Sequence, residues 1–104
     1  MDQKRVFPDW REQVVFSDEG PQPQTLFESG GFKVVLAGLK PGQSIPPHPE
    51  GLAVYYFLEG RGAMMVDGER IAATTGATVI TPQGATRGVE AETQLAFLAT
   101  RLAP

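Results

Sequence analysis

Glycine and proline are spread along the whole of this chain, and their spacing limits what the chain can fold into. Twelve glycines and nine prolines occur among 104 residues, interrupting the sequence about every eight to twelve residues. This spacing suits many short strands joined by turns rather than helices. The runs between the interruptions are rich in β-branched and aromatic residues, which favour strands. The sequence therefore predicts an all-β fold.

Short apolar runs mark the individual strands. Nine segments are expected to be strands, at residues 13–16, 24–28, 32–39, 52–58, 63–66, 69–73, 77–81, 86–90 and 94–101. The clearest hairpin signal is Asp67-Gly68, because both residues can take the positive φ values that a two-residue type I′ turn requires. Residues 8–12 are the one helical candidate, with room for at most a single turn before the first strand.

Length and charge exclude several classes of partner. A chain of 104 residues falls in the range of one domain, which we expect to span residues 1–104. A net charge of −3 and a pI near 5.0 provide no basic surface for nucleic acid. No stretch approaches the roughly 20 apolar residues of a membrane span, and the N-terminus lacks the apolar run of a signal peptide. There is no cysteine, so the default expectation is a cytoplasmic protein without disulfides.

Two expected strands are apolar on both faces. Residues 32–39 and 53–58 carry large apolar side chains at successive positions, so each strand must be covered on two sides. One side can fill the interior, while the other needs an N-terminal arm, residues 1–12 with Phe7 and Trp10, or a second copy of the chain. We expect a homodimer formed by sheet faces or exchanged N-terminal strands. The alternative is a monomer whose own arm covers the sheet.

The only histidine, His48, lies in the segment PGQSIPPHPEGLAVYYFLEG at residues 41–60. Five residues separate it from Gly42, and the YYFLEG run at residues 55–60 has the form of a strand followed by a turn. Pro46 and Pro47, directly before the histidine, have no backbone N–H. They predict a rigid rim or loop entrance at this point rather than a central strand.

A second segment has similarly regular spacing. Glycine, five residues, proline, one residue, glycine, two residues and a final side chain occur at Gly76, Pro82, Gly84 and Arg87. Together, residues 41–60 and 76–87 resemble the two signature motifs of the cupin superfamily. The resemblance covers nearly half the chain and implies an RmlC-like jelly-roll β-barrel of antiparallel strands with a short N-terminal arm. It says less about function, because the superfamily includes enzymes, binding proteins and storage proteins.

The resemblance also implies where a metal would be held, and this chain departs from that pattern. Typical cupins use a pair of histidines, a glutamate and a final histidine to hold one divalent ion. Here His48 and Glu50 remain of the pair region, Ala53 stands at the glutamate position, and Arg87 replaces the last histidine. We therefore expect a degenerate site with no metal cofactor. The alternative is a weak site for one divalent transition metal on His48 and Glu50.

Arg87 is the most consequential of these departures. A guanidinium within about 4 Å of a divalent cation is repelled by several kcal/mol even at an effective dielectric constant of about 20. If its side chain points inward, we expect it to donate hydrogen bonds to Glu50 and to leave His48 to pair with Tyr55 or solvent. If it points outward, a divalent metal could still bind at His48 and Glu50.

An inward Arg87 would give the cavity a cation among apolar walls. Such a pocket favours a small organic anion, such as a carboxylate with a hydrophobic body. The predicted ligand-binding residues are His48, Glu50, Tyr55, Phe57 and Arg87. Phe97 is expected to add to the wall. Only one of Met64 and Met65 should point inward, since adjacent residues of a strand point to opposite sides, and it is either a further wall or plain core.

Two classes of function follow, and the binding class is favoured. In it, the chain is a metal-free or metal-poor cupin that binds a small molecule without catalysis. The alternative is a metal-dependent enzyme of the dioxygenase, isomerase or decarboxylase kind, with His48 and Glu50 as residual ligands and Tyr55 as acid or base. A metal-free isomerase or lyase with His48 as base and Arg87 as electrophile is a subordinate version of the enzyme hypothesis.

Overall fold

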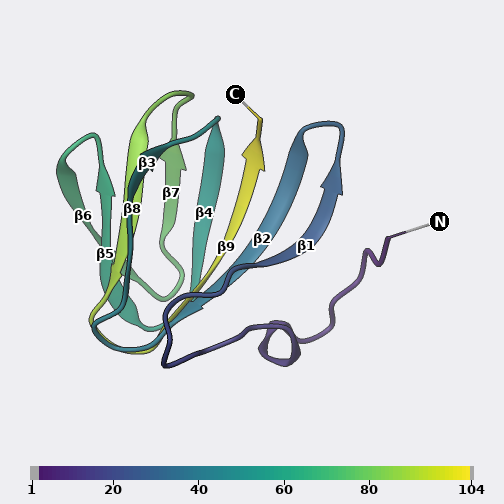
Figure 1. The fold of residues 1–104 in the computed structure, drawn as a ribbon, viewed down its shortest axis with the longest axis horizontal. Coiled ribbons are helices and arrows are strands. Elements are labelled where there is room, and N and C mark those ends of the chain that lie inside the picture. The colour runs from purple at the N-terminus through teal and green to yellow at the C-terminus, as the bar shows by residue number, and fades with distance from the viewer. Residues whose placement is uncertain (1–2, 104) are drawn as a thin grey trace.

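A computed structural model describes residues 3–103. Met1 and Asp2 of the expected arm, and Pro104, lie outside the described residues. One 3-10 turn and nine strands follow each other along the chain (Figure 1): η1 (Trp10–Glu12), β1 (Gln24–Ser29), β2 (Phe32–Leu39), β3 (Ser44–Pro49), β4 (Ala53–Glu59), β5 (Arg61–Val66), β6 (Glu69–Thr74), β7 (Thr78–Thr81), β8 (Thr86–Ala91) and β9 (Leu95–Leu102). No helix within the described residues is long and apolar enough to span a membrane.

The strands form two antiparallel sheets. One has five strands in the order β1-β2-β9-β4-β7, and the other has four in the order β3-β8-β5-β6. In Figure 1 the four-stranded sheet lies on the left, while β4, β9, β2 and β1 follow one another toward the right. The side chains between the sheets form the core, with Leu39, Phe57, Met64 and Leu95 fully buried. The predicted all-β jelly-roll fold is confirmed.

Eight of the nine expected strands are present, with ends within two residues of the expected ones. The strand expected at residues 13–16 is wrong, since this segment joins neither sheet. It packs across β2 instead: a Cβ built on Gly38 would lie 2.7 Å from the carbonyl oxygen of Val15 and 2.8 Å from the side chain of Val14. Its apolar residues therefore cover a sheet without extending it.

The predicted Asp67-Gly68 turn is confirmed. Asp67 has φ 49° and Gly68 has φ 85°, and the turn joins β5 to β6 with Val66 opposite Glu69. The Asp67 carboxylate also accepts a hydrogen bond from the backbone N–H of Thr86, at 2.9 Å, so the turn is fastened to the start of β8. The glycines of the two motifs likewise occupy turns with positive φ, at Gly42, Gly60, Gly76 and Gly84, and this conformation explains the spacing in the sequence.

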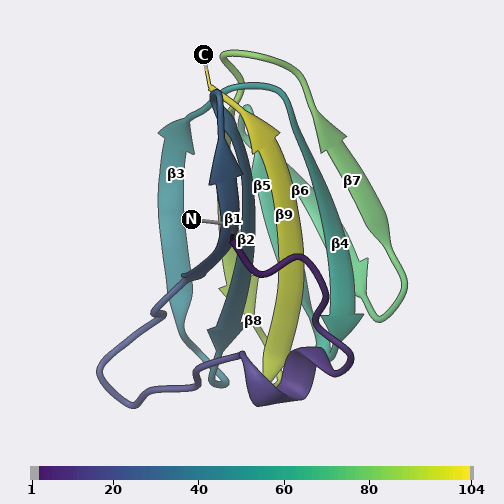
Figure 2. The same ribbon diagram turned by 90° about the vertical axis from the view of Figure 1, so that its right-hand side faces the viewer.

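The N-terminal arm crosses the outer face of the five-stranded sheet and covers only part of it (Figure 2). The helical candidate at residues 8–12 forms the 3-10 turn η1, where the Asp9 side chain accepts a hydrogen bond from the backbone N–H of Arg11. A cavity of about 460 Å³ remains between arm and sheet, lined by Arg5, Phe7, Trp10, Leu26, Phe27, Phe32, Val34, Leu58 and Leu98. Beyond the arm, Tyr56 and Ile80 on β4 and β7 are 43% and 67% exposed.

Candidate functional site

An irregularity in β3 turns the side chain of His48 toward a cavity between the two sheets. Ile45 pairs with Val89 and His48 pairs with Arg87, so three steps along β3 match two steps along β8. This extra residue is a β-bulge, which changes the direction in which the following side chains point. With regular alternation Ile45 and His48 would face opposite sides, whereas both line the same cavity. The expectation of a rim or loop before His48 is thus corrected: Pro46 and Pro47 lie within an edge strand, at its bulge.

Gly88 on β8 allows the bulge to form. A Cβ at this position would lie 2.6 Å from the carbonyl oxygen of Ile45 and 2.8 Å from the backbone nitrogen of Pro47. Both distances are shorter than real Cβ contacts, and the atoms on the other side belong to a backbone that cannot simply rotate away. The bulged backbone of β3 can approach β8 this closely only because residue 88 lacks a side chain.

Arg87 points inward and is 1% exposed. Its Nε and Nη2 atoms both donate hydrogen bonds to the carbonyl oxygen of Ala85, at 3.3 and 3.1 Å, and Nη2 also donates to those of Glu50 and Pro82, at 3.1 and 3.2 Å. The expected hydrogen bond to Glu50 therefore goes to its backbone carbonyl and not to its carboxylate, which is held elsewhere. Main-chain oxygens fix the guanidinium in place without neutralising its charge.

The remaining nitrogen of Arg87 has no such partner. Nη1 is buried and makes no hydrogen bond to any atom of the described residues. A buried polar atom that is left unpaired costs about 1–3 kcal/mol, and more when it is charged. Native structures pair the great majority of such atoms. Nη1 is thus an unpaired charged donor, closed off from solvent, on a residue that lines a cavity.

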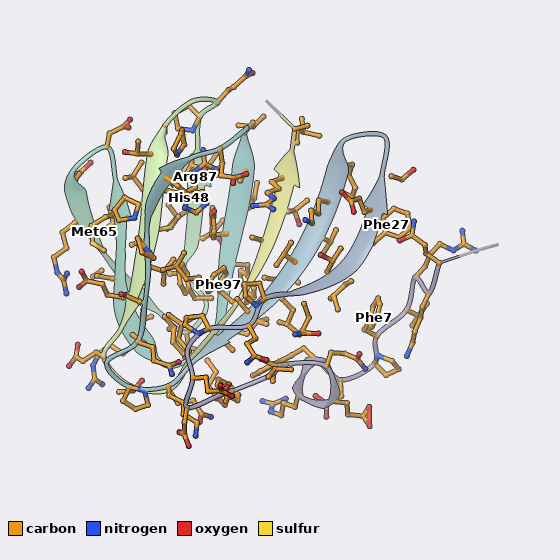
Figure 3. The ribbon with its side chains drawn as sticks, viewed as in Figure 1. Phe7, Phe27, His48, Met65, Arg87 and Phe97 are labelled. Atoms are coloured by element: carbon orange, nitrogen blue, oxygen red, sulfur yellow. The ribbon has the colours of Figure 1, made fainter. Side chains whose placement is uncertain are left out.

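The cavity lies between the two sheets and has a volume of about 140 Å³. Polar and charged groups of its wall lie on β3, β4, β8 and β9, while the rest of the wall is mostly apolar; the lining residues are Pro23, Val35, Ala37, Ile45, His48, Tyr55, Arg87, Gly88, Val89, Phe97, Ala99 and Arg101. Figure 3 shows His48 and Arg87 next to each other toward the upper end of the sheets and Phe97 lower down. An apolar cavity of about 150 Å³ can hold a benzene molecule, so this one suits a ligand whose apolar part is no larger than a benzene ring.

Three charged or titratable side chains form a cluster at the rim, which we call the rim triad: His48, Glu50 and Arg101. The Glu50 carboxylate lies 3.1 Å from Nε2 of His48 through one oxygen and 3.1 Å from Nη1 of Arg101 through the other. The Nδ1 atom of His48 lies 3.0 Å from the carbonyl oxygen of Pro46, so both ring nitrogens face acceptor oxygens. The three side chains are 43%, 23% and 26% exposed, which places them between the cavity and solvent.

Arg101 was not among the expected site residues. It pairs with Ala53 across β4 and β9, so a guanidinium stands opposite the position where the cupin resemblance implies a glutamate. A signal was available in the sequence, because side chains two apart in a strand share a face. Phe97, Ala99 and Arg101 are spaced in this way, and all three line the cavity.

Tyr55 and Phe57 have different places in the structure. Tyr55 is 5% exposed and lines the cavity. Burial raises the pKa of its hydroxyl, and the Arg87 guanidinium close to that hydroxyl, together with the charge of Arg101, opposes this effect without reversing it. The hydroxyl thus stays protonated at neutral pH and can donate a hydrogen bond, although none of ordinary geometry joins it to Nη1 of Arg87. Phe57 is fully buried with its ring 5.6 Å from that of Phe97, and it is not a lining residue.

The two methionines divide as expected for adjacent strand residues. Met64 is fully buried in the core. Met65 lies on the other side of β5, where its sulfur is 3.8 Å from a guanidinium nitrogen of Arg70. Neither methionine lines the cavity, so the inward one, Met64, is plain core rather than part of the cavity wall.

The donor atoms around the cavity do not fit a resident divalent transition metal. Such ions normally take three or more protein ligands, and residues 3–103 contain no group of three or more His, Cys, Asp or Glu side chains placed to share an ion. His48 and Glu50 provide two donors, and these contact each other. Two guanidinium groups, of Arg87 and Arg101, occupy the same region and would repel a cation.

Comparison with known proteins gives a consistent result for the fold. The model of the cupin domain family matches residues 35–100. An RmlC-like cupin protein from Desulfovibrio desulfuricans is similar at 31% identity with a TM-score of 0.80, covering 98% of this chain and 96% of the other. A conserved protein with a double-stranded β-helix domain from Klebsiella pneumoniae superposes with a TM-score of 0.87 at 22% identity, covering 97% and 91%.

A structure with an enzyme name shows the same fold at lower similarity. A predicted oxalate decarboxylase from Thermotoga maritima has 22% identity and a TM-score of 0.74, with 81% of each chain covered. At this identity the likeness concerns the fold alone. No curated protein matches the chain at a significant level.

Proposed function

The chain belongs to the cupin family, and from this premise we propose that it binds a small organic anion, a carboxylate with a short apolar body, in the cavity beside His48 and Arg87. One observation carries the proposal: Nη1 of Arg87 is buried, charged and without a hydrogen-bond partner among the described residues. A carboxylate oxygen is the partner that such a donor binds most strongly.

The surroundings of Arg87 support the same type of ligand. Backbone carbonyls already hold Nε and Nη2, so the guanidinium is fixed before a ligand arrives and little conformational freedom is lost on binding. Tyr55 can donate a second hydrogen bond to the same carboxylate. Phe97 and Ala99 offer apolar surface for the remaining carbon atoms.

The small cavity limits the size of this ligand. A volume of about 140 Å³ is comparable to cavities that hold benzene. Crotonate, with four carbon atoms, and benzoate are therefore suitable probes, whereas a fatty acid is too long. We propose binding without a metal, because the donor atoms do not fit one, and we assign no catalytic step.

Isothermal titration calorimetry with crotonate and benzoate tests the proposal. Arg87→Met should weaken binding of either acid by about 10- to 100-fold, since hydrogen bonds to charged groups contribute about 1.5–3 kcal/mol. Arg61→Met is a matched control, because Arg61 pairs with Glu92 on the surface, and it should leave the affinity unchanged. Crotonamide, a neutral molecule of the same shape, should bind the wild-type protein at least tenfold more weakly than crotonate.

Three results would contradict the proposal. The first is that neither acid binds the wild-type protein at millimolar concentration. The second is that Arg87→Met binds as tightly as wild type. The third, which does not depend on the folding of any variant, is that crotonamide binds as well as crotonate.

We further propose that the chain forms a homodimer through the outer face of the five-stranded sheet. Val54, Tyr56 and Ile80 on this face are 40%, 43% and 67% exposed, and apolar patches of this kind on a small domain mark interfaces. The cytoplasmic location remains a prediction.

A further inference from the structure

The rim triad contains an acidic group where an anion-binding site would be expected to avoid one. Glu50 contributes a carboxylate whose two oxygens contact His48 and Arg101, each at 3.1 Å. Both partners line the cavity. The two arginines of the cavity wall therefore differ. Arg101 is paired with the carboxylate of Glu50, whereas Nη1 of Arg87 has no hydrogen-bond partner among the described residues.

We infer that Glu50 is the specificity-determining residue that restricts the cavity to ligands with a single carboxylate. The inference rests on the proposed binding of organic anions and adds which anions the cavity binds, namely monocarboxylates. A ligand carboxylate that reaches Nη1 of Arg87 would pair with a donor that no described protein atom holds. A second carboxylate on the same ligand would have to pair with Arg101 or His48, and Glu50 already occupies both.

Electrostatic repulsion acts in the same direction. A second carboxylate at the rim would stand close to Glu50, whose like charge repels it and whose carboxylate already neutralises the charge of Arg101. Solvent at the partly exposed rim weakens this repulsion, with Glu50 at 23% exposure. We expect it to separate ligands of one and two charges by a factor of about ten.

The position of Glu50 also argues against a purely structural role. Its backbone carbonyl oxygen accepts from Nη2 of Arg87 and from the N–H of Gly84, so the main chain is fixed without the carboxylate. The side chain is thus free to serve discrimination at the rim.

Crotonate and fumarate form a matched pair of probes for this inference. They share a planar four-carbon skeleton, and fumarate carries a carboxylate where crotonate has a methyl group. We expect wild-type protein to bind crotonate at least tenfold more tightly than fumarate at one fixed pH and ionic strength. Glu50→Gln, which keeps the size of the side chain and frees Arg101, should shift the ratio of the two dissociation constants at least tenfold toward fumarate.

Two further variants serve as a control and as an independent test of the role of Glu50. Glu90→Gln is the matched control, because Glu90 on β8 pairs with Arg70 on the surface at 2.7 Å, and it should leave the ratio unchanged. Arg101→Gln leaves Glu50 with one partner fewer and should shift the ratio in the opposite direction, away from fumarate. It therefore tests the inference even if Glu50→Gln does not fold.

The outcomes separate this inference from the proposed function. If crotonate does not bind wild-type protein, the proposed function fails and the inference fails with it. If crotonate binds but Glu50→Gln leaves the ratio unchanged, or if Glu90→Gln shifts it equally, the role of Glu50 is refuted while anion binding stands. A wild-type protein that prefers fumarate would also refute it.

Discussion

His48 and Arg87 are register partners on neighbouring antiparallel strands, β3 and β8. Directly opposed residues of such a pair have Cβ atoms about 4.5–5.5 Å apart and point to the same face of the sheet. The imidazole and the guanidinium thus enter one cavity side by side, one engaged with the Glu50 carboxylate and the other with backbone carbonyls. This pairing depends on the bulge in β3, and the predictions below follow from it and from the surrounding contacts.

Arg87→Met should destabilise the fold by about 2 kcal/mol. The substitution removes the donors to the carbonyl oxygens of Ala85, Glu50 and Pro82, and a buried acceptor that loses its partner costs about 1–3 kcal/mol. Part of this loss is offset because a buried charge also disappears. Equilibrium unfolding in urea gives the difference, with Arg61→Met expected within about 0.5 kcal/mol of wild type. A Met variant as stable as wild type would show that these hydrogen bonds make no net contribution.

Gly88→Ala should cost about 2–3 kcal/mol and should also reduce anion binding. The added Cβ would overlap the backbone of Ile45 and Pro47, so β3 must move away from β8 and take His48 with it. Gly30→Ala is the comparison, because Gly30 has φ 55° and no atom within 4 Å of its added Cβ; it should cost about 1 kcal/mol. Urea unfolding and titration with crotonate measure the two effects. Equal costs at both glycines would argue against a tight approach of β3.

Tyr55→Phe should remove a component of alkaline unfolding. Burial raises the pKa of Tyr55 in the folded state, above the value of about 10 in an unfolded chain. The folded protein therefore holds this proton when the unfolded chain has released it. The resulting stability is fully present below pH 10 and is lost as pH rises through the folded pKa, by up to about 1.4 kcal/mol per pH unit.

Urea unfolding of wild type and Tyr55→Phe at pH values from 8 to about 11.5 measures this component, because all other titrating groups are common to both proteins. The stability difference should be constant below pH 10 and should change above it, to the disadvantage of wild type. A difference that stays constant over the whole range would mean that Tyr55 titrates alike in both states.

Tyr56→Lys should convert a dimer into a monomer. Tyr56 is 43% exposed on the outer face of the five-stranded sheet, next to Val54 and Ile80, and stable interfaces of about 1,200–2,000 Å² tolerate an unpaired charge near their centre poorly. Sedimentation velocity at micromolar concentration should show wild type at twice the monomer mass and the variant at the monomer mass. Glu69→Lys on β6, in the other sheet, should remain dimeric. A monomeric wild type would refute the dimer directly.

The sequence identified the elements whose signals are local. Asp67-Gly68 predicted its turn correctly because both residues tolerate positive φ, and the motif glycines were recognisable for the same reason. β3 was missed because Pro46 and Pro47 argue against a strand, and only the bulge reconciles them with one. The strand expected at residues 13–16 carried a valid apolar signal, but the signal arose from packing against β2 rather than from pairing.

The site was only partly predictable. His48, Glu50, Tyr55 and Arg87 do gather around one cavity or its rim, as the motif spacing suggested. The alternation of Phe97, Ala99 and Arg101 could have indicated that Arg101 faces the cavity, but its place opposite Ala53 follows only from the pairing of β4 with β9. The choice of Arg87 between carboxylate and carbonyl partners likewise depends on the path of the loop before β8.

The pair of prolines in β3 has a consequence for the behaviour of this protein in concentrated solution. β3 is the outermost strand of its sheet, and an open strand edge of this kind invites chains to add on and grow into fibrils. Two consecutive prolines lack backbone N–H groups, so a strand of another molecule that pairs with this edge would find fewer hydrogen-bond donors. The segment that directs an imidazole inward thereby also makes this border of the molecule a poor template for aggregation.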